Sequence, residues 1–228
     1  MTDPNAPRRG IRSYVQRGGR ITSGQRRALD ELWQRYGLDA GGGPLDLDRT
    51  FGRRAPRVLE IGYGDGSAIV ALASARPECD VLGIEVHAPG IGHCLKLAAA
   101  AGLSNLRLIR GDATEILRER IPAGTLAHAL LWFPDPWPKK RHHKRRLIQP
   151  EFATLLASRL AVGGRLNVAS DWEPYAEQIV TVLSGTTGLV NAAADGRYVA
   201  RAARVVTRFE TRGARLGHRV RDIEFIKQ

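Results

Sequence analysis

The chain has 228 residues, of which 43% are hydrophobic, and its formal net charge is +12 with a pI near 10.6. This length and hydrophobic content allow one domain with a full core, and the charge implies a polyanionic partner, nucleic acid before an anionic membrane surface. No apolar stretch is long enough to cross a membrane or to form the core of a signal peptide, and Cys79 and Cys94 are too few for a disulfide framework or a four-cysteine metal site. We therefore expect a cytoplasmic protein without a metal, either a monomer or a homodimer.

The N-terminal region divides into an arm and a helix. Residues 1–24 are rich in Pro, Gly and Arg and carry no periodic apolar residues, which is typical of a flexible basic arm. Over 25–36, apolar residues recur at helical spacing and predict an amphipathic helix that packs on the main domain. Three glycines and a proline at 41–44 end this helix, and a polar linker leads to Arg57. Residues 25–228 are expected to form a single domain.

From Arg57 onward, the pattern alternates between short apolar strands and helices. Strands are expected at 58–61, 81–85, 106–109, 126–133 and 165–169. Helices are expected to follow them, at 67–75, 94–101, 113–120, 150–160 and 175–183. Near the C-terminus, 204–211 and 220–226 are expected to be two strands joined by a Gly-containing loop. These repeated βαβ units predict an α/β fold with a largely parallel sheet, closed by an antiparallel C-terminal hairpin, and with helices on both faces.

A glycine-rich loop follows the first of these strands, with Gly62, Gly64 and Gly66 at alternate positions. Glycine lets a backbone turn sharply and approach a ligand closely. The dinucleotide-binding fingerprint G-x-G-x-x-G places its third glycine one residue later, and the strand here carries Glu60 near its end. A carboxylate at this place would repel a pyrophosphate and would hold a cationic ligand. An NAD-dependent oxidoreductase is therefore disfavoured.

Two further acids come at the ends of the next two strands. Glu85 is placed to accept hydrogen bonds from ribose hydroxyls, and Asp112 could accept one from an adenine amino group. A ligand with a ribose, an adenine and a cationic amino-acid end fits these two acids together with Glu60. That ligand is S-adenosylmethionine. The alternative is a glycine turn with three solvated acids.

A proline-rich motif, FPDPWPKK at 133–140, follows the fourth strand. Its three prolines cannot pair in the sheet, so the chain leaves the sheet here and holds Asp135 on a stiff loop, where open α/β sheets bind their ligands. Every residue from Lys139 to Arg146 is Lys, Arg or His. An acid at a ligand-binding edge, joined to a strip that can bind polyanions, indicates chemistry on a nucleic acid. The alternative is a Pro-rich turn followed by solvated charges.

Three stretches, LEIGYGDG at 59–66, GIEVH at 83–87 and above all FPDPWPK at 133–139, resemble the bacterial tRNA (guanine-N7-)-methyltransferase family. TRFE at 207–210 and RLGH at 215–218 are similar to the closing motif of that family. The resemblance extends from about residue 12 to the C-terminus. It implies a Rossmann-like class I methyltransferase fold with S-adenosylmethionine as the cofactor. It also implies methylation of guanine N7 at position 46, in the variable loop of tRNA, to form 7-methylguanosine.

The same resemblance implies roles for individual residues. The cofactor would be bound by Glu60, Gly62, Gly64, Gly66, Glu85, Asp112 and Asp135. The substrate would be contacted by Lys139, Asp171, Thr207, Arg208, Phe209 and Glu210. The tRNA would be bound by Arg141, His142, His143, Lys144, Arg145 and Arg146.

The chemistry that this reaction needs agrees with the residues present. Guanine N7 carries a lone pair and no proton, so no base has to deprotonate the nucleophile, and catalysis should come mainly from in-line positioning. Positive charge appears on the guanine, and Asp135 is the candidate catalytic residue because a nearby carboxylate would stabilise that charge. Asp171 and Glu210 are candidates for recognition of the base. Each could instead be structural, Asp171 by capping the helix that follows and Glu210 by pairing with an arginine on the neighbouring strand.

Two other functions remain open on the sequence alone. One is a methyltransferase that acts on an exocyclic amine of a nucleic acid, because 134–137 distantly echoes the Asn/Asp-Pro-Pro-aromatic loop of such enzymes. In that loop the two prolines are adjacent, whereas here they flank Asp135. The other is a non-catalytic RNA-binding protein that has kept the fold, and the intact glycines and acids argue against this loss of cofactor binding.

Overall fold

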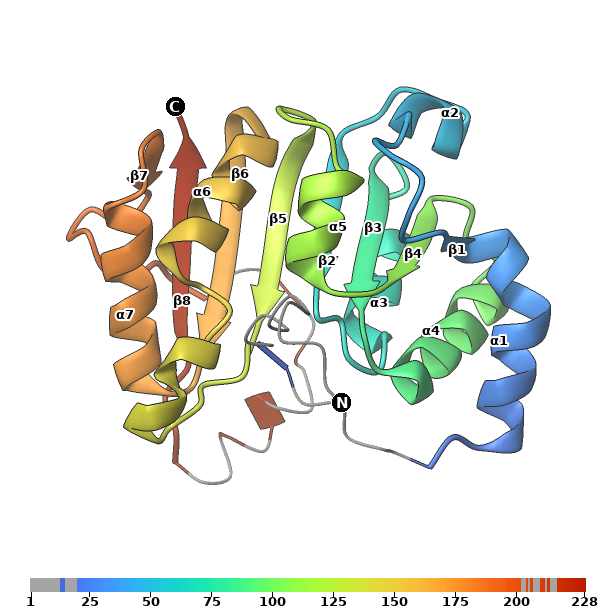
Figure 1. Cartoon of the computed structure of the whole chain (residues 1–228), viewed down its shortest axis with the longest axis horizontal. Coiled ribbons are helices and arrows are strands. Elements are labelled where there is room, and N and C mark those ends of the chain that lie inside the picture. Colours follow the sequence, from blue (N-terminus) through green and yellow to red (C-terminus); the bar gives the residue numbers. More distant parts are fainter. Residues whose placement is uncertain are drawn as a thin grey trace, which may run out of the picture.

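A single eight-stranded sheet forms the centre of the computed structural model, which describes residues 13–14, 20–201, 204, 206, 210–211, 213 and 217–228 (Figure 1). In chain order the strands are β1 (Gly37–Leu38), β2 (Arg57–Ile61), β3 (Asp80–Glu85), β4 (Leu106–Arg110), β5 (Leu126–Trp132), β6 (Leu160–Ser170), β7 (Leu189–Asn191) and β8 (Arg221–Lys227). Across the sheet their order is β1-β4-β3-β2-β5-β6-β8-β7, and the neighbours from β1 to β6 are parallel. β8 runs antiparallel to β6 and β7. The predicted α/β fold with a largely parallel sheet is thus confirmed.

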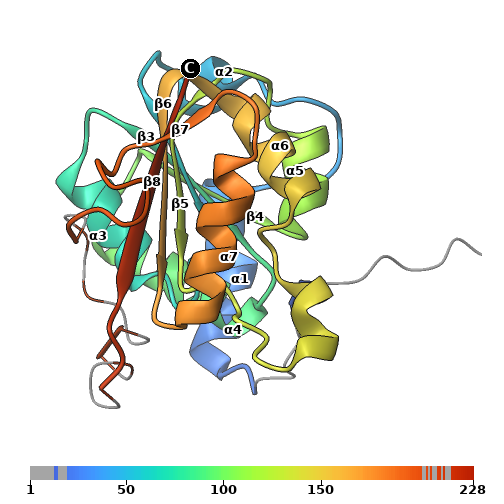
Figure 2. The same cartoon turned by 90° about the vertical axis from the view of Figure 1, so that its left-hand side faces the viewer.

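Helices cover both faces of this sheet. They are α1 (Ser23–Tyr36), α2 (Leu47–Phe51), α3 (Ser67–Ala75), α4 (Ala88–Ala100), α5 (Ala113–Glu119), the 3₁₀ helix η1 (Lys140–Arg145), α6 (Pro150–Arg159) and α7 (Glu173–Ser184). Figure 2 shows the sheet edge-on, with α5, α6 and α7 on one side and α3 on the other. Each helix predicted from the pattern is present; α4 begins six residues before the predicted 94–101, and the ends of the others differ by two residues or fewer.

The two faces are filled by alternate residues of the central strands, because successive side chains on a strand point in opposite directions. Val58 and Val81 pack against α1, α3 and α4, whereas their neighbours Leu59 and Leu82 pack against α5, α6 and α7. All six residues of β3 are buried. This continuous burial is typical of a parallel strand with helices on both sides.

The N-terminal helix α1 begins two residues earlier than the sequence pattern predicts. Thr22 is its N-cap, because the Thr22 hydroxyl accepts from the Gln25 amide while the Gln25 side chain accepts from the Thr22 amide. This reciprocal capping box fixes the start of the helix. The predicted arm, residues 1–24, lies largely outside the described residues, and α2 occupies part of the predicted polar linker, with Asp46 as its N-cap.

The C-terminal hairpin was predicted from the wrong pair of segments. β8 is present as expected, but Glu210 and Thr211, the last two residues of the other expected strand, are helical. β8 is inserted between β6 and the short strand β7, and both of these strands pair with it antiparallel. β7 has three residues, which is too short for an alternating pattern to reveal.

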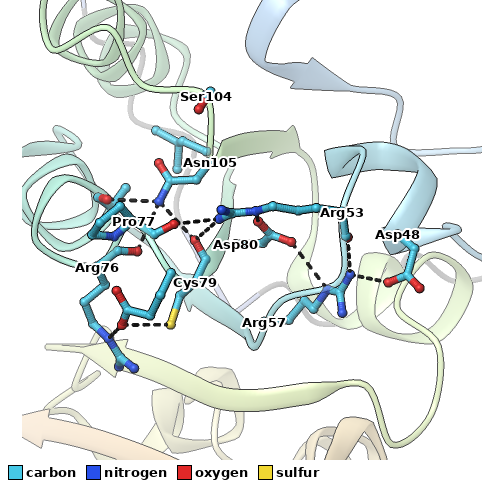
Figure 3. Close-up of polar contacts among 12 residues, drawn as sticks. Asp48, Arg53, Arg57, Arg76, Pro77, Cys79, Asp80, Ser104 and Asn105 are labelled. Carbon is cyan, nitrogen blue, oxygen red and sulfur yellow. Dashed lines mark hydrogen bonds and ion pairs between the residues drawn. The ribbon is translucent and has the colours of Figure 1, made fainter.

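The amino end of β3 is tied down by a buried carboxylate, Asp80, whose side chain is fully buried (Figure 3). Arg53 Nε lies 2.7 Å from Asp80, and Arg57 Nε lies 3.7 Å from its other oxygen. Beside them, the buried Asn105 side chain donates to the carbonyls of Ala73 and Cys79, each at 3.0 Å. These contacts anchor the connection from α3 to β3 and lie at the edge of the sheet opposite the site described next.

Candidate active site

A cavity of about 750 Å³ opens at the carboxyl ends of β2, β3 and β5. The acids in its lining are Glu60, Asp65, Glu85 and Asp135, and none of the described residues that line it is a lysine or an arginine. This is a local reversal of charge in a chain with a net charge of +12. The cavity therefore favours a ligand that carries positive charge.

The predicted glycine loop forms one wall of the cavity. Gly62, Gly64 and Gly66 have φ angles of 74°, 61° and 83°, a left-handed conformation in which any side chain is strained. The Gly62 amide donates to the Ile84 carbonyl at 2.8 Å, and the Gly64 amide donates to the Glu85 carboxylate at 2.9 Å. The loop is thus folded back against the end of β3, and its backbone needs glycine at all three positions.

Glu85 is held firmly at the end of β3. Besides the Gly64 amide, the amides of Val86 and His87 donate to its carboxylate at 2.7 and 3.0 Å. Three backbone donors fix the position of this acid, and it lines the cavity. The structure therefore places Glu85 where a bound ligand could share its oxygens.

Glu60, the other buried acid of the cavity, is 2% exposed. Burial, with the nearby charge of Glu85 as a second cause, raises the pKa of Glu60 to about 8. The Glu60 carboxyl therefore holds a proton at neutral pH when the cavity contains no cation. A cation beside it would favour the ionised form.

Asp112 has a structural task that the sequence analysis missed. It is the N-cap of α5, and its Oδ1 accepts from the amides of Thr114 and Glu115 at 2.8 and 3.3 Å. Its neighbours Gly111 and Ala113 line the cavity. The predicted contact of Asp112 with an adenine amino group stays a prediction.

The proline-rich loop brings Asp135 to the mouth of the cavity, where its side chain is exposed. The loop starts from a constrained backbone: Phe133 has a φ of 53°, and its amide donates to the Ala169 carbonyl of β6 at 2.8 Å. Trp137, further along the loop, has a φ of 42°. Positive φ angles are rare for bulky residues and occur where surrounding contacts hold the chain, often at functional sites.

Arg146 supports this loop from below. It is 3% exposed, its Nε donates to the Pro136 carbonyl at 2.8 Å, and its guanidinium lies 4.9 Å from the centre of the Tyr175 ring. Because Arg146 is buried, it is not available to contact RNA, and its expected role in RNA binding is corrected to support of the loop. Within a run of charges, the sequence gives no sign that one of them points inward.

Trp137 joins the loop to two other segments. Its indole nitrogen donates to the Ser13 carbonyl at 3.1 Å, and Ser13 and Tyr14 line the cavity. On η1, the Arg145 guanidinium lies 4.9 Å from the Trp137 ring centre and the His142 ring meets it edge-on at 5.7 Å. The Trp137 and His142 rings and the Arg145 guanidinium therefore pack together, and this packing holds η1 beside the loop.

The basic strip lies on η1 and at its start, next to Asp135. Lys139, Arg141 and Lys144 are exposed, and His142, His143 and Arg145 are half-buried. The structure thus brings the expected RNA-binding residues, other than Arg146, to the same edge of the sheet as the cavity. Thr207, Arg208 and Phe209, expected to contact the substrate, lie outside the described residues.

Asp171 and Glu210, for which the sequence allowed either base recognition or a structural role, have different contacts. Asp171 does not cap α7, because the N-cap of that helix is Trp172, which makes no side-chain hydrogen bond there. The Asp171 Oδ2 atom instead lies 3.4 Å from His218 Nδ1. Glu210 pairs with two arginines, Arg201 at 2.9 Å and Arg204. Burial raises the pKa of Glu210, but hydrogen bonds from both guanidinium groups outweigh this effect and lower it overall. The pairing expected for Glu210 exists, although its partners do not lie on a strand.

Sequence analysis also missed His93 in the lining of the cavity. Its Nδ1 lies 2.8 Å from the Asp65 carbonyl, so that nitrogen carries the proton and the ring braces the glycine loop. A single histidine within a helix has no pattern that reveals this contact. In the described part of the chain, no cluster of side chains could hold a metal ion, and no helix has the length and hydropathy needed to cross a membrane.

Comparison with known proteins gives consistent matches. Residues 54–223 match a family model described as "Putative methyltransferase". The chain is 49% identical to the tRNA (guanine-N(7)-)-methyltransferase of Alkalilimnicola ehrlichii, covering 99% of this chain and 96% of that protein. It is 52% identical to the protein of the same name from Leifsonia xyli, covering 94% of each. Among solved structures, the 16S rRNA methyltransferase KamB has the same fold, with a TM-score of 0.58 at 17% identity over 80% of this chain and 93% of that one.

Proposed function

Because this chain belongs to the tRNA (guanine-N(7)-)-methyltransferase family, we propose that it methylates N7 of guanine 46 in the variable loop of tRNA, with S-adenosylmethionine as methyl donor. The observation that carries the proposal is a cavity lined by acids, opening beside Asp135 and flanked by the basic helix η1. We propose a cytoplasmic location on the same ground, because tRNA is a cytoplasmic substrate.

The charge of the cavity supports S-adenosylmethionine as the ligand. That molecule has a cationic sulfonium and an ammonium group, and the described lining offers four acids without a lysine or arginine. Glu60, which is buried and has a raised pKa, is the group that gains most from a neighbouring cation. We assign Glu60 and the glycine loop to the amino-acid end, and Glu85 to the ribose hydroxyls.

We assign the catalytic role to Asp135. When bound, S-adenosylmethionine supplies a methyl group on a positively charged sulfur, and guanine N7 needs no base to become a nucleophile. The task of the protein is to place N7 in line with that methyl group and to stabilise the positive charge that develops on the guanine. Asp135 is exposed at the mouth of the cavity, on a loop held by Arg146 and Trp137, where its carboxylate can serve both needs.

The basic strip is the proposed contact for the tRNA backbone. We assign this role to Arg141, His142, His143, Lys144 and Arg145, with Lys139 nearer to the guanine. Contacts of this kind release counterions, so tRNA affinity should fall steeply as salt rises. Asp171, which lies near His218 and is partly exposed, is the proposed contact for the guanine edge.

The proposal is tested by incubating the protein with unmodified tRNA transcript and S-adenosylmethionine labelled in its methyl group, followed by nucleoside analysis. We expect label in 7-methylguanosine, and none in a transcript in which guanine 46 is replaced by adenine. Label in a base methylated on an exocyclic amine would move the function to that class of enzyme. Bound cofactor without any labelled nucleoside would indicate an RNA-binding protein.

A further inference from the structure

Arg204 lies beside the site, and its side chain is 5% exposed. Its guanidinium pairs with Glu210 and lies 3.3 and 3.5 Å from the two carboxylate oxygens of Asp222. The same group lies 5.2 Å from the centre of the Trp132 ring and 5.3 Å from that of Phe133. One planar cation therefore contacts two acids and two aromatic rings.

These four partners come from the segments that surround the proposed guanine site. Trp132 ends β5, and Phe133 opens the proline-rich loop that carries Asp135 two residues later. Asp222 lies on β8, paired with Ala169 of β6. Glu210 belongs to the C-terminal segment. Arg204 is thus the point at which the loop, the sheet and the C-terminal segment meet.

The position of Phe133 makes this contact consequential. Its φ of 53° is unfavourable for an aromatic residue, so neighbouring contacts must hold it. On the backbone side, the Phe133 amide donates to the Ala169 carbonyl at 2.8 Å. On the side-chain side, Arg204 lies against the ring. A shift of Phe133 would move Asp135, because Pro134 between them gives the chain little freedom.

We propose that Arg204 is a positioning residue, which holds the Asp135 loop and Glu210 in the arrangement that receives the guanine. The inference rests on the proposed function and adds a residue that does not touch the reacting atoms. Lysine cannot replace Arg204 fully, since it lacks the planar fork that pairs with two carboxylates and stacks on aromatic rings. Arg204 does not itself line the cofactor cavity, but Trp132 and Phe133 do, so cofactor affinity has to be measured beside the methylation rate.

Arg201 offers a matched control. It pairs with the same carboxylate, Glu210, at 2.9 Å, but its side chain is 44% exposed, whereas Arg204 is the arginine that lies against Trp132 and Phe133. Substituting Arg201 removes its pairing with Glu210 and its hydrogen bond to the Arg204 carbonyl at 3.2 Å, but it keeps the Arg204 guanidinium that meets the rings. The difference between the two arginine variants therefore isolates what Arg204 does beyond pairing with Glu210.

The experiment compares Arg204→Ala, Arg204→Lys and Arg201→Ala in the full chain. It measures the single-turnover rate of tRNA methylation, cofactor affinity by calorimetry and thermal stability. Displacing reacting groups by about 1 Å costs roughly 100-fold in rate, so we expect the methylation rate of Arg204→Ala to fall by that order. The rate of Arg204→Lys should fall less, and that of Arg201→Ala by at most about threefold. Cofactor affinity should fall less than the methylation rate in both Arg204 variants, because Arg204 itself does not line the cavity, and should stay within about twofold in Arg201→Ala. Millimolar guanidinium should restore part of the Arg204→Ala rate and leave the other two unchanged.

Two results would overturn the inference: wild-type rate in Arg204→Lys, or equal losses in Arg204→Ala and Arg201→Ala without rescue by guanidinium. If Arg204→Ala fails to fold, the lysine variant decides, because it keeps the positive charge in the same place. All rates are ratios to the wild-type protein. A wild-type protein that does not methylate tRNA would refute the proposed function, whereas an active wild type with an equally active lysine variant would refute only the role of Arg204.

Discussion

The pKa of Glu60 leads to a quantitative prediction for cofactor binding. Burial first, and the charge of Glu85 second, raise this pKa to about 8, so roughly a tenth of the protein carries an ionised Glu60 at pH 7. A cationic ligand that binds the ionised form has an apparent affinity proportional to that fraction. The affinity for S-adenosylmethionine should therefore rise about tenfold per pH unit below pH 7 and level off as the pH passes about 8.

The test is calorimetric titration of wild type and Glu60→Gln with S-adenosylmethionine between pH 6 and 7.5. The neutral glutamine cannot ionise, so the variant should lose the slope of affinity against pH. Other groups near the cavity, such as His87 and His93, remain in both proteins, and the difference between the two isolates Glu60. Wild-type titrations in two buffers of different ionisation enthalpy should show release of nearly one proton per cofactor at pH 7. A flat affinity in the wild type, or the same slope in Glu60→Gln, would refute the reasoning.

The same shift has a consequence for stability. A folded-state pKa of about 8, against an ordinary value of 4.5, means that the folded protein binds more protons than the unfolded chain between these limits. Glu60 therefore lowers the free energy of unfolding as pH rises from about 4.5 to 8, by about 5 kcal/mol at most. Without cofactor, Glu60→Gln should melt above the wild type at pH 8.5, with the gap closing toward pH 5.

Three further predictions concern the RNA strip, the glycine loop and the far edge of the sheet. Charge reversal of Lys144 and Arg145 to Glu should weaken tRNA binding in a filter-binding titration by about tenfold or more and leave cofactor affinity intact. The control is Arg54→Glu, because the Arg54 side chain is 91% exposed on the opposite edge of the sheet. Equal losses of tRNA affinity in both proteins would refute a specific RNA-binding strip. Gly90→Ala would place a Cβ 2.1 Å from the Gly64 carbonyl oxygen, so it should push the glycine loop away and lower cofactor affinity by roughly tenfold. Gly41→Ala, whose Cβ would have no neighbour within 4 Å, should leave cofactor affinity unchanged. Equal cofactor affinities in the two variants would contradict this packing. Arg53→Met leaves buried Asp80 with Arg57 at 3.7 Å, so chemical denaturation should report a loss of about 2 kcal/mol, and an unchanged midpoint would show that Asp80 does not need Arg53.

The sequence pattern predicted the parallel half of the fold because its signals are local. The strands β2 to β5 are short and largely apolar, and glycines at positive φ mark the loop after β2. The acids Glu60 and Glu85 follow from their place at strand ends, since parallel strands bring their carboxyl ends to one edge. For the same reason Asp135 was expected at this edge, and it lines the cavity.

What could not be predicted depends on contacts between distant segments. Arg146 sits among charged residues but is buried, because Tyr175 of α7 and the Pro136 carbonyl receive its guanidinium. The three-residue strand β7 pairs with the outer edge of β8, and Glu210 and Thr211 are helical instead of extended. Arg204 gains its role from two rings and two acids brought together only by the fold. Periodicity and spacing along the chain do not predict contacts between side chains that lie far apart in the sequence.

The most direct test of the central claim is the methyl-transfer assay on unmodified tRNA transcript, run with wild type and with Asp135→Ala. The account predicts label in 7-methylguanosine at position 46 with the wild type. For the alanine variant it predicts a single-turnover rate lower by roughly 100-fold or more, in a protein that stays folded. Label in another nucleoside, or near-normal 7-methylguanosine formation by Asp135→Ala, would contradict it.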